Sequence, residues 1–144
     1  MRILDYSGVE WALYNYRQFK ARLENAQKTK KYIEDTESGV GAISYDGVHT
    51  GKTNAISSPV ENAAMTREKM LKSLTAEIQE LEVLIHRTDV SFYALPEREQ
   101  CILRAYYIER RSWQEISQKN NYSVSWCKKR RKKAIEEMIK TINA

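Results

Sequence analysis

Apolar residues recur at steps of three and four along most of the chain, which predicts an all-α protein. One such stripe covers residues 7–34, and a second covers residues 59–88, where Pro59 starts the helix. The stripes comprise Val9, Ala12, Tyr16, Phe19, Leu23, Ala26 and Ile33 in the first and Val60, Ala64, Leu71, Leu74, Ile78, Leu81 and Ile85 in the second. Each is a heptad-like seam that one helix alone cannot bury. We therefore expect the two helices to pair as a coiled-coil-like hairpin, either within one chain or between chains.

Residues 35–58, between these helices, contain four of the five glycines and are predicted to form a long loop. Gly51-Lys52-Thr53 has part of the phosphate-loop pattern. Only three residues separate Gly47 from Gly51, however, whereas that motif requires four. The loop is therefore not predicted to bind a nucleotide.

The apolar pattern breaks again at residues 89–93 and restarts at Leu95-Pro96, where the proline suits the start of a helix. This break is predicted to separate two domains. Residues 1–93 would form a helical arm, and residues 94–144 would form a second, smaller helical domain.

A helix-turn-helix is predicted between Ser112 and Ala134. A short helix with Ile116 on its inner side is followed by Asn120 and Asn121, and asparagine tolerates the left-handed backbone of a sharp turn. Ser123 then occupies the N-cap position of a long second helix. The inner face of that helix is predicted to comprise Cys127, Ala134, Ile135, Met138, Ile139 and Ile142.

The outer face of the second helix is strongly basic, because residues 128–133 are six consecutive lysines and arginines. Such a run would repel itself on a merely solvated face, and it favours nucleic-acid binding. One of Arg130 and Arg131 must lay its aliphatic stem along the core while the other faces outward. The predicted DNA-binding residues are Ser123, Val124, Ser125, Trp126, Lys128, Lys129, Arg130, Lys132 and Lys133. Trp126 is expected either to pack on the preceding helix or to touch a thymine methyl group.

Charge is distributed unevenly. Residues 95–144 hold 12 lysines and arginines against 6 acidic residues, whereas residues 1–94 hold 12 against 13. Phosphate contact is therefore expected in the C-terminal third alone. No segment has the length and apolarity of a membrane span or signal peptide, so a cytoplasmic location is expected.

Candidate catalytic or metal chemistry is sparse. His49 and His86 lie far from each other and from Cys101 and Cys127, so metal-ligand spacing is missing and no cofactor is predicted. Both cysteines are at helical positions that indicate an inward or near-inward direction, and they are expected to be small core residues rather than a disulfide. No nucleophile–base pair is recognisable, so the protein is predicted not to be an enzyme.

Leu95-Pro96-Glu97-Arg98-Glu99, the apolar positions that follow it, and the basic helix ending at Ala134-Ile135 together resemble region 4 of bacterial sigma factors. The resemblance covers about residues 95–140. It implies a DNA-binding helix-turn-helix whose surface around residues 95–104 docks on host RNA polymerase. Arg110 and Asn121 stand where that family often has glycine.

The stretch from Tyr45 to Gly51, followed by residues 56–61, is similar to the glycine-rich segment of small phage transcriptional activators, the ArpU/RinA-like group. That resemblance implies a regulator of late packaging or lysis genes. We therefore expect a DNA-binding transcription regulator. The alternatives are the small subunit of a phage DNA-packaging terminase, or a helical adaptor whose basic tail binds nucleic acid.

Overall fold

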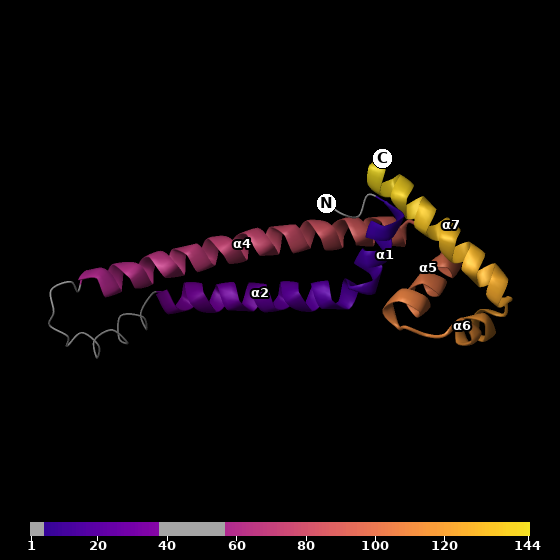
Figure 1. The fold of residues 1–144 in the computed structure, drawn as a ribbon, viewed down its shortest axis with the longest axis horizontal. Coiled ribbons are helices and arrows are strands. Elements are labelled where there is room, and N and C mark those ends of the chain that lie inside the picture. Colours follow the sequence, from indigo (N-terminus) through magenta and orange to yellow (C-terminus); the bar gives the residue numbers. More distant parts are fainter. Residues whose placement is uncertain (1–4, 38–56) are drawn as a thin grey trace. The chain divides into compact units, whose positions relative to one another are not determined.

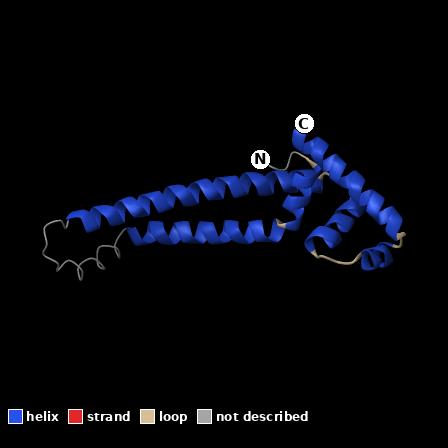
Figure 2. Ribbon diagram, in the orientation of Figure 1, coloured by secondary structure: helices blue, strands red, loops and turns tan. Residues whose placement is uncertain are grey.

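The computed structural model describes residues 5–37 and 57–144, and these residues are helical almost throughout, with no strand among them (Figure 2). The all-α fold class is therefore confirmed. The helices are α1 (Tyr6–Tyr14), α2 (Tyr16–Glu37), α4 (Ser57–Tyr93), α5 (Glu97–Leu103), the π-helix η2 (Arg104–Ile108), α6 (Trp113–Asn120) and α7 (Val124–Asn143) (Figure 1). Most of the predicted loop 35–58, including its phosphate-loop-like stretch and the Tyr45–Gly51 part of the phage-activator-like stretch, lies outside the described residues. Residues 57–61, which also belong to the phage-activator-like stretch, form the start of α4.

The predicted helix 7–34 is two helices, which corrects that prediction. The chain breaks at Asn15, whose backbone angles are −104° and 11° and whose side-chain amide donates to the Trp11 carbonyl at 2.8 Å. Asp5, two residues before the predicted start, caps α1 by accepting from the Gly8 N–H at 2.7 Å. The heptad-like spacing runs straight through this break, so periodicity alone could not locate it.

The chain divides into two compact units. Unit 1 contains Met1–Ala21 and Leu81–Ala144, and unit 2 contains Arg22–Glu80. This division differs from the domain boundary predicted at residues 93 and 94, because the predicted break at residues 89–93 is helical and α4 continues to Tyr93. The last turns of α4 therefore belong with the helices that follow them rather than with an arm.

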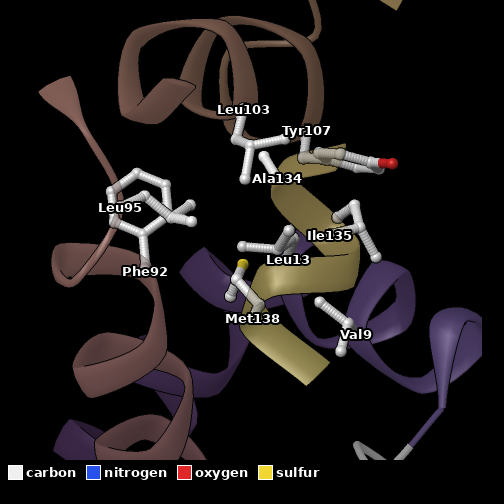
Figure 3. Packing of buried hydrophobic residues seen from close by; sticks show 9 residues of the cluster. All are labelled: Val9, Leu13, Phe92, Leu95, Leu103, Tyr107, Ala134, Ile135 and Met138. Atoms are coloured by element: carbon white, nitrogen blue, oxygen red, sulfur yellow. The ribbon is translucent and has the colours of Figure 1, made fainter. Parts of the chain in front are cut away.

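The core of unit 1 brings together α1, the end of α4, α5, η2 and α7. Figure 3 shows Ile135 and Met138 of α7 beside Leu13 of α1. The cluster comprises Val9, Leu13, Phe92, Leu95, Leu103, Tyr107, Ala134, Ile135 and Met138. The predicted inner face of α7 is confirmed, since Cys127, Ala134, Ile135 and Met138 are buried and Ile139 and Ile142 are half-buried.

The π-helix η2 directs two adjacent tyrosines to different neighbours. The Glu109 N–H donates to the Arg104 carbonyl at 2.9 Å, five residues back, which is the wider turn of a π-helix. Tyr107 is fully buried and its hydroxyl donates to a Glu10 carboxylate oxygen in α1 at 2.6 Å. Tyr106 stacks on Trp113 of α6, with ring centroids 4.3 Å apart. The segment thus joins α1 to α6.

Arg110, directly after η2, has a φ of 58° and so adopts the left-handed backbone that favours glycine. Its guanidinium lies 5.0 Å from the centre of the Tyr14 ring and donates to the Tyr14 carbonyl at 3.2 Å. These two contacts offset part of the cost of the left-handed conformation. They also attach the η2–α6 connection to the end of α1.

In unit 2, helices α2 and α4 run antiparallel. Arg22 pairs with Glu77 at 3.0 Å, and Ile33 lines the same surface groove as Asn62 and Thr66. Seam residues Ala26, Ile33 and Ile78 are buried, whereas Leu23, Leu71 and Leu74 are half-buried and Ala64 is exposed. The ion pair is exposed and contributes no more than about 1 kcal/mol, so the apolar seam supplies most of the pairing energy.

Candidate nucleic-acid interface

The connection between α6 and α7 is organised by local side-chain hydrogen bonds. Ser112 and Glu115 form a reciprocal capping box at the start of α6. Asn121 ends α6 with a φ of 59° and a ψ of 35°, the left-handed conformation predicted for it. The Ser117 hydroxyl donates to the Tyr122 carbonyl, and Ser123 accepts from the Trp126 N–H at 3.1 Å as the N-cap of α7. A single left-handed residue and one N-cap therefore set the turn.

The predicted DNA-binding residues lie on one side of α7 and at its N-cap. Exposed positions lie opposite the buried side chains of Cys127 and Ala134, and half-buried positions lie at the margin. The exposed residues are Ser123, Ser125, Lys128, Lys129, Lys132 and Lys133, and the half-buried residues are Val124, Trp126 and Arg130. The Ser123 hydroxyl oxygen already serves as the helix cap. Four of the six consecutive cations therefore point away from the core.

Trp126 packs on the turn that precedes its helix. Its ring stacks on Tyr122, with centroids 3.9 Å apart and planes 14° from parallel. Two guanidinium groups flank this stack. Arg98 of α5 lies 5.0 Å from the Tyr122 ring, and Arg130 lies 5.1 Å from the Trp126 ring. Stacking between two cations restricts the indole, so Trp126 is a rigid margin of the basic face.

The two adjacent arginines have different surroundings. Arg130 donates from Nη1 to the Glu99 carboxylate at 3.3 Å, and that glutamate is buried. The Arg131 guanidinium lies over the rings of Tyr106 and Trp113, at 5.3 and 5.4 Å, and its side chain is 23% exposed. Arg131 is therefore the inward member of the pair. Arg130, one of the predicted DNA-binding residues, forms an ion pair within the protein.

Arg131 also belongs to a polar cluster that reaches α1. Its Nη1 lies 4.0 Å from Glu10 Oε2, the same oxygen that accepts from the Tyr107 hydroxyl. The Arg131 Nε is buried without a hydrogen-bond partner. Burial and the hydrogen bond to Glu10 raise the pKa of Tyr107 well above its usual range. The inward arginine is thus held by an acid 121 positions away in the chain.

The raised tyrosine pKa predicts alkaline destabilisation. Because folded Tyr107 keeps its proton to higher pH than unfolded Tyr107, its contribution to stability is complete below the unfolded pKa of about 10 and is lost as pH rises further. Tyr107→Phe is expected to reduce the pH dependence of the free energy of unfolding above pH ~10. Urea unfolding at a series of pH values measures this effect. Tyr32→Phe, at a site 70% exposed, is the control and should leave the pH dependence unchanged.

Sequence patterns missed several contributors to this surface. Arg98, Glu99 and Tyr122 surround the basic face, and Glu10 holds Arg131, although none was among the predicted site residues. The contact between Glu99 and Arg130 spans 31 positions, and helical periodicity carries no signal at that separation. The adjacent Arg130 and Arg131 were the one indication of such a contact in the sequence, because a charge at an inward position requires an acid nearby.

The possible metal ligands and the two cysteines of the described part of the chain give little support for a metal site or a reactive thiol. Residues 5–37 and 57–144 contain no group of three or more His, Cys, Asp or Glu side chains that could hold a metal ion. Both cysteines are free thiols, but Cys101 is exposed, so the prediction that it is a small core residue is wrong. Ile102 and Leu103 occupy the inner face of α5 and turn Cys101 outward. Burial raises the pKa of the Cys127 thiol.

Comparison with known proteins places the chain in a family. None of the helices described for residues 5–37 and 57–144 is long and apolar enough to cross a membrane. No curated protein and no solved structure matches the chain. A family model described as a protein of unknown function matches residues 19–140, which is most of the sequence and includes α4 to α6 and most of α7. The chain therefore belongs to the DUF722 family.

Proposed function

We propose that α6 and α7 form a helix-turn-helix that binds double-stranded DNA, with α7 in the major groove, and that the protein regulates transcription. The supporting observation is that the two arginines and the four lysines of residues 128–133 have different surroundings. Arg130 and Arg131 are engaged by Glu99 and by the cluster around Glu10, whereas the four lysines of the run are exposed. In the described part of the chain, none of these lysines has a carboxylate partner. They are available for phosphates or base edges.

Roles can be assigned along α7. A recognition helix places its N-terminal residues at base edges, which assigns Val124, Ser125 and Lys128 to bases. Lys129 and Lys132, further along the exposed face, are assigned to phosphates together with Lys133. The Lys128 Nζ lies 5.9 Å from the centre of the Trp113 ring, so its charge lies close to α6.

The resemblance to small phage activators extends the proposal to activation of late phage genes, and the sigma-like resemblance extends it to contact with host RNA polymerase. The N-terminal part of α5, where Glu97 and Arg98 are exposed, is the surface assigned to that contact. An interaction assay between the full chain and the polymerase, with Glu97→Lys as the disrupting variant, tests this part separately from DNA binding.

Phosphate and base contacts predict different responses to mutation. Lys129→Ala and Lys132→Ala should each weaken binding to any duplex and flatten the slope of log affinity against log salt by about one unit. Lys128→Ala should lose about 1–3 kcal/mol on a duplex obtained by selection and much less on a random duplex. Fluorescence anisotropy over a salt series on both duplexes measures these effects.

The matched control lies on the same helix. Lys140 is exposed near the end of α7 and pairs with Glu137 at 3.2 Å, so Lys140→Ala should leave the salt slope unchanged. Equal affinities and slopes for wild type and all three variants of the basic face would refute the proposed interface.

A further inference from the structure

The last turns of α4 present a line of exposed apolar side chains on the side of the helix opposite the core of unit 1. Leu84 and Phe92 are buried on the inner side. On the outer side, Val83 and Val90 are 41% and 50% exposed. Tyr93, 62% exposed, lies at the margin of this side, where it also lines a groove with Leu13 and Tyr16. A single exposed apolar residue is ordinary on a protein surface, but three on one line of one helix form a patch.

The spacing of this line is that of a coiled-coil seam. Positions 83, 86, 90 and 93 alternate steps of three and four, so Val83 and Val90 occupy equivalent a positions and His86 and Tyr93 occupy d positions. His86 is also exposed, and a polar residue in a seam lowers stability while restricting the register. This outer line is distinct from the inward-facing stripe that the sequence pattern identified on the same helix.

The charges beside the line complement those of a second copy of the same helix. With Val83 at an a position, Glu82 is a g residue and Arg87 is the e residue of the following heptad. Both are exposed, and neither has an ion-pair partner among the described residues. In a parallel two-stranded coiled coil these g and e positions face each other across the seam.

We infer that this outer face of α4, comprising Val83, His86, Val90 and Tyr93, is a homodimer seam that pairs with a second copy in parallel. Two-fold symmetry would form the Glu82–Arg87 pair twice, once on each side of the seam. An antiparallel arrangement would oppose like positions instead and lose both attractive pairs. The inference goes beyond DNA binding, because it names a partner and an orientation.

The dimer would also contain two copies of the basic helix α7. Joining two DNA-contacting surfaces raises the effective concentration of the second surface once the first is bound. Association without DNA is nevertheless the property tested, so loss of the dimer and loss of DNA binding are separate outcomes.

Sedimentation of the full chain over a concentration series, without DNA, tests the seam. We expect a concentration-dependent dimer. Val90→Asp should raise its dissociation constant at least about 100-fold, because the seam would bury two unpaired carboxylates. Val90 is exposed in the single chain, so this variant should retain its helical circular dichroism.

Charge exchange tests the parallel orientation. Glu82→Lys and Arg87→Glu should each weaken the dimer about tenfold, because two attractive pairs become repulsive. The double variant Glu82→Lys/Arg87→Glu should return to within about twofold of wild type, since the pairs are re-formed with reversed sign. Glu136→Lys, an exposed acid on α7, is the matched control and should leave association unchanged.

Three results would overturn the inference. The first is a wild-type chain that stays monomeric up to the highest concentration measured. The second is a dimer that Val90→Asp leaves intact, which would put the interface elsewhere. The third is a double charge variant no tighter than either single variant, which would exclude the parallel pairing.

Discussion

Leu13→Ala is expected to lower the free energy of unfolding of unit 1 by about 3 kcal/mol, although Leu13 is more than 110 positions from the basic run. Leu13 is 1% exposed and packs in the same cluster as Ile135 and Met138 of α7. Truncation removes buried methyl groups and leaves a cavity that the neighbouring helices fill only in part. The loss is a large share of the stability of a small domain.

Native-state hydrogen exchange of the α7 amides in the full chain measures this effect, because those amides report on opening of unit 1. Leu23→Ala is the control. Leu23 is half-buried in α2 and belongs to unit 2, so its truncation should leave the protection of α7 close to wild type. Unchanged α7 protection in Leu13→Ala would show that α1 is not part of the same cooperative unit.

Glu10→Leu is expected to cost about 2 kcal/mol, whereas Arg131→Leu should preserve or increase stability. Removing the carboxylate leaves the buried Tyr107 hydroxyl without its acceptor and Arg131 without its acid. Removing the arginine instead eliminates a buried Nε that has no hydrogen-bond partner, and Glu10 still accepts from Tyr107. Leucine also retains apolar contact with the aromatic rings that the guanidinium covers.

Urea unfolding followed by tryptophan fluorescence compares the two variants, since Trp113 lies beside Arg131. The informative quantity is the difference between the two free energies. Equal losses in both variants would mean that attraction between Arg131 and Glu10 outweighs the cost of burying them. The double variant Glu10→Leu/Arg131→Leu separates that coupling from the loss of the Tyr107 hydrogen bond.

Features that depend on residues a few positions apart were predictable from the sequence. Helical periodicity predicted the all-α class and the buried face of α7, including Ala134 and Ile135. Ser123 predicted the N-cap of α7, because a cap depends on one side chain and a backbone N–H three residues later. Asn121 predicted the turn, because a turn depends on the backbone angles of one residue. These interactions are local, so their residue types and spacing are sufficient evidence.

Only the tertiary structure decided which helices share a core and how the charged residues are paired. The break at Asn15 leaves α1 packed with α7, and the contacts of Tyr107 with Glu10 and of Arg130 with Glu99 span 97 and 31 positions. The sequence required that one of two adjacent arginines face inward, but the two are the same residue type, and the apolar pattern does not distinguish which of the two positions, about 100° apart on the helix, is the inward one. Which arginine faces inward depends on the acid that lies beside each one, because an inward charge is tolerated only where folding brings an opposite charge or an acceptor to it.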